Sequence, residues 1–157
     1  MCRKNENIMG FPNSYSSWDP AAMREGYKIF DELVSDPVFA TSAWLLESYG
    51  MKGVHAVPDD ANAVAPEERR YQLLTSPMLW WQGDDQSDRE KAIDRGSRIQ
   101  HAVRSKTLLP HSYVNYAYGN EEVGETYGRD EKRLAKLRKL KKQWDPKNKF
   151  GFYNPIQ

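Results

Sequence analysis

The chain has 157 residues, of which 39% are hydrophobic and 29% charged, so it has room for one domain or for a piece of a larger one. The formal net charge of +1 gives no overall field that would attract nucleic acid or an anionic membrane. The single cysteine, Cys2, excludes an internal disulfide framework, and no apolar run approaches the roughly 20 residues that span a bilayer.

The first part of the chain predicts an irregular lead-in followed by a helix. Residues 1–17 are rich in Asn, Ser, Pro and Gly. Asp19 can cap a helix whose first position is Pro20, where a missing N–H costs nothing. Asp36-Pro37 is expected to end this helix. Its apolar side chains recur at helical spacing: Met23, Tyr27, Phe30 and Val34, flanked by Ala22, Ile29 and Leu33.

Three segments are then typical of strands. Residues 39–49 are rich in aromatic and aliphatic side chains and close at Gly50. Residues 54–57 are a short second candidate. Residues 71–81 are the third, and Pro77 within them predicts a bulge or an edge position, because proline cannot donate to a sheet ladder.

The second half predicts a helix, a strand and a last helix. The helix from Ser87 is expected to end before Pro110, and residues 111–119 alternate in the manner of a strand. An acidic connection over 120–128 leads to a helix over 130–144. With the extended tail that follows, this order indicates an α+β fold, an antiparallel sheet of about four strands covered by helices.

The closing segment resembles a known family. An aromatic Y-x-N-Y strand (YVNY, 113–116) is followed by a Tyr-Gly turn at 127–128. A helix patterned R-L-x-x-L/V-K and the motif D-P-x-N-x-F complete the order. This arrangement is similar to the C-terminal segment of berberine-bridge-enzyme-like FAD-linked oxidases. A looser likeness begins near residue 40, although the loop at 65–69 lacks the histidine of the family's A/P-F-P-H-R.

The resemblance implies a protein with two domains, one that binds flavin and one that binds substrate. In this chain, residues 18–110 would be part of the substrate-binding domain, and residues 111–157 would be the berberine-like segment. Family members bind FAD in another domain, and no G-x-G-x-x-G occurs here. The implied function is oxidation of a small organic substrate (a secondary metabolite, alcohol or sugar) by proton abstraction and hydride transfer to flavin. The alternative is a non-catalytic truncated remnant or small-molecule-binding module, so enzyme activity of the chain alone stays open.

The resemblance also points to site residues. Tyr116, with Tyr113, matches the catalytic tyrosines, and Asn115 could bind the flavin edge. A tyrosine base needs nearby positive charge or donors, because an unperturbed phenol has a pKa near 10. Some members carry Lys and Gln where this chain has Leu74-Thr75-Ser76, which leaves the activation of Tyr116 unexplained. The alternative is that these tyrosines are half-buried strand aromatics.

Other features favour structural interpretations. The three histidines at 55, 101 and 111 are too scattered to predict a zinc site, and we expect no metal. The basic helix over 130–144 could suggest nucleic-acid binding, but a solvated face opposite a leucine stripe explains it better, so we expect neither nucleic-acid nor membrane partners. The chain as written carries no secretory signal, which predicts a cytoplasmic location by default and leaves the compartment open if the chain is a fragment.

Overall fold

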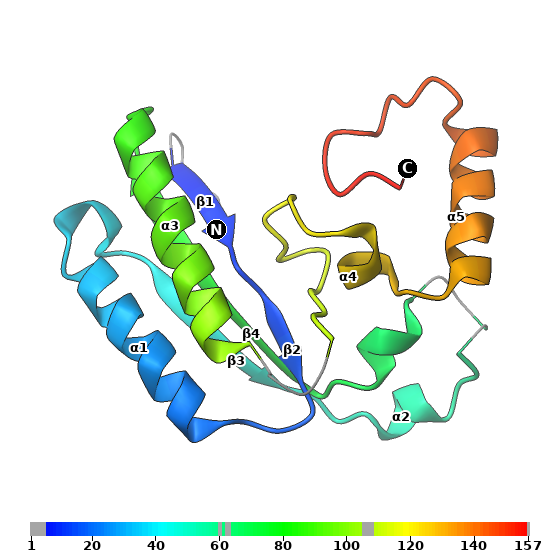
Figure 1. Cartoon of the computed structure of the whole chain (residues 1–157), viewed down its shortest axis with the longest axis horizontal. Coiled ribbons are helices and arrows are strands. Elements are labelled where there is room, and N and C mark those ends of the chain that lie inside the picture. Colours follow the sequence, from blue (N-terminus) through cyan, green and yellow to red (C-terminus); the bar gives the residue numbers. More distant parts are fainter. Residues whose placement is uncertain (1–5, 60, 62–63, 105–108, 157) are drawn as a thin grey trace.

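The computed structural model describes residues 6–59, 61, 64–104 and 109–156. Helices pack beside an antiparallel sheet, and the C-terminal third lies to one side of it, so the α+β prediction is confirmed (Figure 1). None of the described helices combines the length and apolarity needed to cross a bilayer. The elements are β1 (Glu6–Gly10), β2 (Asn13–Tyr15), α1 (Pro20–Val34), β3 (Ala43–Ser48), α2 (Lys52–His55), β4 (Leu73–Gln82), α3 (Gln86–Val103), α4 (Val123–Tyr127) and α5 (Glu131–Trp144), with 3-10 turns at Pro37–Phe39 and Pro66–Arg69.

The sheet has four strands, and the long β4 is its centre. Strands β1 and β2 pair with β4 one after the other along the same side, and β3 pairs with the opposite side. All pairings are antiparallel, with Ile8 opposite Trp80, Ser14 opposite Leu74 and Leu45 opposite Ser76. The predicted number of strands is therefore right, although their membership differs from the prediction.

Pro77 lies inside this central strand, so the predicted bulge or edge position is wrong. The pairings Gly10–Met78 and Asn13–Thr75 keep one continuous register, which leaves no room for an extra residue. The Pro77 carbonyl accepts a hydrogen bond from Phe11 N–H at 3.2 Å. Its nitrogen faces the same neighbour, since both backbone groups of a residue point to one side of an antiparallel strand. The missing N–H thus falls at the interruption between β1 and β2.

The irregular lead-in predicted for residues 1–17 is wrong over β1 and β2, while residues 1–5 lie outside the described part. Asn13 and Tyr15 of β2 are buried, and distant partners satisfy their polar groups. Asn13 Nδ2 donates to the Gln100 carbonyl at 3.0 Å, and Tyr15 Oη donates to the Val103 carbonyl at 2.7 Å. Composition alone missed these strands because their partners lie on α3, nearly 90 residues later.

Residues 54–57 do not form the predicted strand; α2 occupies Lys52–His55 instead. The buried Arg69 explains this outcome. Its guanidinium donates to the Val57 carbonyl at 2.7 Å and the Val54 carbonyl at 3.3 Å, and so satisfies the end of the helical turn. A cation 12 residues further along therefore decides the local structure.

Helices α1 and α3 cover one face of the sheet. As predicted, α1 is capped by Asp19, whose Oδ1 accepts from the N–H groups of Ala21 and Ala22. Gly96 of α3 lies so close to Phe11 that an added Cβ would be 2.0 Å from the ring. The core between helices and sheet comprises Met9, Phe11, Phe30, Leu33, Phe39, Leu79, Trp81, Ala92 and Ile99.

The strand predicted over 111–119 is also absent, and this segment forms turns. The N–H of Tyr116 donates to the Tyr113 carbonyl at 2.9 Å, which closes a turn instead of pairing with the sheet. The acidic connection predicted over 120–128 contains α4, whose first turn is closed by a reciprocal capping box between Glu122 and Glu125.

The last helix begins as predicted, with Asp130 accepting from Arg133 N–H at 2.7 Å. Its apolar stripe is buried only at Leu134, since Trp144 is 76% exposed. After the helix, the Asp145 carboxylate accepts from Lys149 N–H at 2.7 Å, Phe150 N–H at 3.0 Å and the Lys141 ammonium. These bonds fold the start of the tail back on the helix and give the D-P-x-N-x-F motif a structural role.

Candidate active site

The face of the sheet opposite α1 and α3 presents a different set of side chains. Thr75 and Trp44 hydrogen-bond to each other, and Trp44 packs against Phe30 of α1, so both belong to the helix-covered face. Side chains alternate along a strand. The neighbours in register, Leu45, Glu47, Leu74 and Ser76, therefore share the second face.

The turn over 113–117 lies on this second face. The carbonyl oxygen of Tyr116 approaches Gly10 so closely that a Cβ there would be 2.3 Å from it. Ser112 Oγ donates to the Pro12 carbonyl at 3.4 Å. After the turn, the Tyr118 ring stacks on Phe11 of the helix-side core, with centroids 5.6 Å apart. Glycine at position 10 is thus required for the close approach of Tyr116 to β1.

The C-terminal tail holds the same turn from its other side. Tyr153 Oη donates to the Val114 carbonyl at 2.9 Å and also contacts the Ala117 carbonyl. Within the turn, Asn115 Nδ2 donates to Tyr113 Oη at 2.7 Å. The tail therefore fixes the backbone that carries the three predicted site residues.

Glu47 of β3 contributes a carboxylate to this face. Its Oε1 lies 3.5 Å from the Tyr116 hydroxyl, and its Oε2 is buried without a hydrogen-bond partner among the described residues. A buried, unpartnered carboxylate oxygen is costly to a fold unless a ligand or function requires it. Glu47 is therefore a candidate for chemistry on this face of the sheet.

The Glu47 carboxylate helps to raise the pKa values of the neighbouring tyrosines. Hydrogen bonding to Glu47 raises the pKa of Tyr49 to about 12, and the negative charge adds to that shift. Burial, and then the charge of Glu47, raise the pKa of Tyr116 above its ordinary value. Both phenols therefore stay protonated near neutral pH and face Glu47 as hydrogen-bond donors.

We expect Glu47→Gln to lower the pKa of Tyr49 from about 12 towards the ordinary tyrosine value near 10. The sign follows from removing a negative charge, which makes the phenolate easier to form. A titration of tyrosine Cζ resonances by NMR over the alkaline range measures it. Tyr127 is the internal control, since burial alone raises its pKa. An unchanged Tyr49 titration would rule out the Glu47 contact.

The structure brings together only part of what the sequence predicts. The Tyr113 and Tyr116 rings pack edge to face, with centroids 5.3 Å apart, and both are half-buried. Asn115 is exposed and its side chain contacts Tyr113. Sequence reasoning missed Glu47. Its one signal was a lone carboxylate between the apolar and aromatic residues of a predicted strand.

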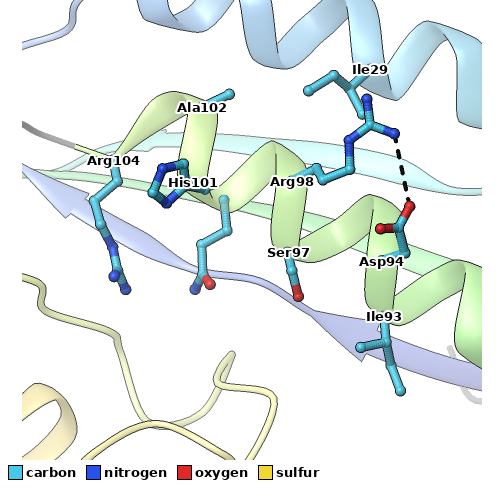
Figure 2. A pocket seen from close by; sticks show the side chains of 9 residues that line it. Ile29, Ile93, Asp94, Ser97, Arg98, His101, Ala102 and Arg104 are labelled. Atoms are coloured by element: carbon cyan, nitrogen blue, oxygen red, sulfur yellow. Dashed lines mark ion pairs between the residues drawn. The ribbon is translucent and has the colours of Figure 1, made fainter.

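A hollow of about 610 Å³ runs along α3 on the helix side of the molecule (Figure 2). Arg98, His101 and Arg104 project around it, and Arg98 is paired with Asp94 at 3.8 Å. The hollow is lined by α3 and by Ile29 of α1, which cover the opposite face from Glu47. It contributes nothing to the tyrosine cluster.

Comparison with known proteins shows which sequences the chain resembles. Residues 112–157 match the family model described as "Berberine and berberine like". The chain is also 31% identical over 149 residues to the FAD-linked oxidoreductase chyH of Penicillium rubens, and 32% identical over 160 residues to chry5 of Gibberella zeae. These matches cover 93% and 99% of this chain.

The chain belongs to the berberine-bridge-enzyme-like family. It spans about 30% of the length of these relatives, 29% of chyH and 31% of chry5. The segment that matches the family model, residues 112–157, includes the turn with Tyr113 and Tyr116. Glu47 lies upstream of this segment, in the region that matches the FAD-linked oxidoreductases.

Solved structures share the fold of this berberine-bridge-enzyme-like chain. A variant of Physcomitrella patens BBE-like 1 superposes with a TM-score of 0.66 at 16% identity, covering 97% of this chain and 30% of that one. FgChi7B superposes with a TM-score of 0.62 at 19% identity, covering 96% and 34%. The sheet with its two covering helices is thus an arrangement found in larger proteins.

Proposed function

We propose that this chain forms the substrate-facing wall of the active site in an FAD-dependent oxidoreductase that oxidises a small organic molecule, such as a secondary metabolite, an alcohol or a sugar. The observation that carries the proposal is the buried, unpartnered Oε2 of Glu47 beside the protonated Tyr116. Support comes from the relatives, whose names describe FAD-linked oxidoreductases.

The pair suits the removal of a proton from a substrate hydroxyl. The sequence predicts Tyr116 as the base, but its raised pKa disfavours the phenolate. We therefore assign proton acceptance to the Glu47 carboxylate, and to Tyr116 the role of a donor that orients it. For an alcohol, the O–H proton passes to Glu47, the C–H hydrogen leaves as hydride with its electron pair, and a carbonyl forms.

The residues on this face fit one side of a flavin ring and not the whole cofactor. FAD, when bound, supplies the acceptor for the hydride. The exposed Asn115 side-chain amide has a carbonyl oxygen and an NH2 group that can hydrogen-bond to the polar edge of the ring. The half-buried Tyr113 and Tyr116 offer aromatic surface. Glycine-rich loops often bind a diphosphate, and none is present in this sequence, so we infer that a separate flavin-binding part completes the site.

Purified alone, the chain is expected to carry no flavin, because it can bind only one side of the ring. Absorbance between about 350 and 500 nm, the flavin region, measures this directly. Joined to the flavin-binding part of a relative such as chyH, the chain should form a yellow protein whose flavin is reduced by a panel of alcohols, phenols and sugars. Stoichiometric flavin on the isolated chain would contradict the proposal, and a flavin-loaded fusion that no substrate reduces would favour the non-catalytic module.

In that flavin-loaded protein, Tyr116→Phe is expected to lower kcat by about tenfold to a hundredfold, because loss of the hydroxyl leaves Glu47 less well oriented. Lys139→Ala is the control, since Lys139 is exposed on α5. Anaerobic stopped-flow measurement of flavin reduction reports the rate. Equal rates for the two variants would remove Tyr116 from the site.

A further inference from the structure

A small cavity borders the tyrosine cluster and is not explained by proton removal at Glu47. It has a volume of about 270 Å³, and its walls include Tyr49, Tyr71 and Tyr113. Leu73, Leu74 and Met51 supply apolar surface, while Glu68 and Ser14 supply the polar groups. Apolar walls with a few placed polar groups are the usual composition of a small-molecule site.

Ser14 is the first sign that the cavity is built for a ligand. It is only 9% exposed, and its hydroxyl has no hydrogen-bond partner among the described residues. Its neighbours Asn13 and Tyr15 point to α3, so Ser14 points to the opposite face, where it is paired in register with Leu74. Burial of an unsatisfied hydroxyl costs stability. A ligand that hydrogen-bonds to it removes that cost.

Glu68 is the second sign, because a buried group fixes its carboxylate. His111 is 3% exposed and its Nε2 lies 2.8 Å from Glu68 Oε1, while its ring stacks on Tyr71 with centroids 5.5 Å apart. The contact is close but not aligned as a full hydrogen bond. It holds Glu68 at the cavity wall, and among the described residues no Lys or Arg lines the cavity to balance the carboxylate.

The cavity also adjoins the proposed reaction centre. Tyr49 lines it and is two residues from Glu47 on the same strand face, and Tyr113 lines it and packs edge to face on Tyr116. A molecule held in the cavity therefore lies next to the Glu47–Tyr116 pair. The volume accommodates about one ring, which is less than a typical drug-sized pocket of roughly 300–1,000 Å³.

We propose that this cavity is the recognition subsite for the substrate of the proposed oxidoreductase, and that it takes one uncharged ring that bears a hydroxyl group. The hydroxyl donates to Glu68, and the tyrosine rings and leucines contact the faces of the ring. A carboxylate or phosphate would meet Glu68 as a like charge and is excluded. A hydroxyl can donate to Glu68 and can also accept the proton of a serine hydroxyl, whereas an ammonium group has no lone pair and leaves the Ser14 proton without an acceptor. The ligand class rests on the proposed function, but binding to the cavity does not.

The test is a titration of small ligands into the full chain without flavin, in which backbone amide NMR shifts report binding. The probes are 4-methylphenol, its methyl ether 4-methylanisole, 4-methylbenzoate and benzylamine. We expect 4-methylphenol to bind with a dissociation constant of the order of 1 mM, as one ring in a small site allows. Its shifts should centre on residues 14, 49, 68, 71 and 113. The methyl ether should bind at least about fivefold more weakly, because it cannot donate to Glu68.

Variants decide which groups recognise the hydroxyl. Glu68→Gln is expected to weaken 4-methylphenol binding by about tenfold and Ser14→Ala by about threefold, as loss of a charged and of a neutral hydrogen bond predicts. Glu25→Gln and Ser97→Ala are the matched controls, since both residues are exposed on the helix side of the molecule. If Glu68→Gln does not fold, Ser14→Ala with the methyl ether still tests the hydroxyl contact.

If 4-methylbenzoate or benzylamine binds as tightly as 4-methylphenol or more tightly, the proposed ligand class is wrong. If the shifts caused by 4-methylphenol centre on other residues, the proposed site is wrong. Because no flavin or turnover enters this measurement, an inactive fusion protein leaves its result intact. In an active fusion, Glu68→Gln should raise KM with kcat little changed, which separates recognition at the cavity from chemistry at Glu47.

Discussion

Replacing Glu47 by Gln is expected to lower kcat of the flavin-loaded fusion by about 10²–10⁴-fold, the usual contribution of a positioned general base. Gln keeps the size of the side chain and can still accept a hydrogen bond from Tyr116, but it cannot take a proton. The loss should therefore fall on the chemical step, with KM changing little. Pre-steady-state flavin reduction under anaerobic conditions measures that step without the reoxidation that follows.

Two comparisons make this expectation specific to Glu47. Glu90→Gln, on the exposed surface of α3, should leave the rate of flavin reduction unchanged. If Tyr116 were the base, as the sequence predicts, Tyr116→Phe would cost more than Glu47→Gln. The order of the two losses therefore distinguishes the assignments. A rate for Glu47→Gln within about twofold of the parent would show that Glu47 does not accept the proton.

Gly96→Ala is expected to lower the free energy of unfolding by about 3 kcal/mol, the upper end of what overpacking usually costs. A Cβ at this position would lie 2.0 Å from Phe11 Cε2 and 2.4 Å from Cζ, so α3 or the ring must move. In an exposed helix the same change gains about 1 kcal/mol, because alanine is the better helix former. The sign of the effect thus reports the packing of α3 on the sheet.

Urea unfolding followed by circular dichroism measures this change. Gly53→Ala in α2 is the matched control, since an added Cβ there meets nothing within 4 Å, and its stability should be unchanged or slightly raised. Adding Phe11→Leu to Gly96→Ala should recover part of the lost stability by removing the ring that clashes. If Gly96→Ala is as stable as the parent chain, the close contact between α3 and Phe11 is contradicted.

The sequence by itself determined the features whose causes lie within a few residues of one another. Helix α1 begins where Asp19 and Pro20 predict, because a cap needs only the next turn. Helix α5 begins after Asp130 for the same reason. The berberine-like motif was also readable, since its order lies in one continuous segment, and it led directly to the turn that carries Tyr113, Asn115 and Tyr116.

Only the tertiary structure decided the features whose causes lie far away in the chain. Strand β2 exists because α3 satisfies Asn13 and Tyr15, and α2 replaces a strand because Arg69 caps its carbonyls. Glu47 meets Tyr116, 69 residues later, because β3 pairs with β4 and the turn packs on Gly10. Burial and hydrogen bonding between distant segments outweigh local propensity at these positions. A local sequence pattern does not indicate which distant segment of the chain will pack against it.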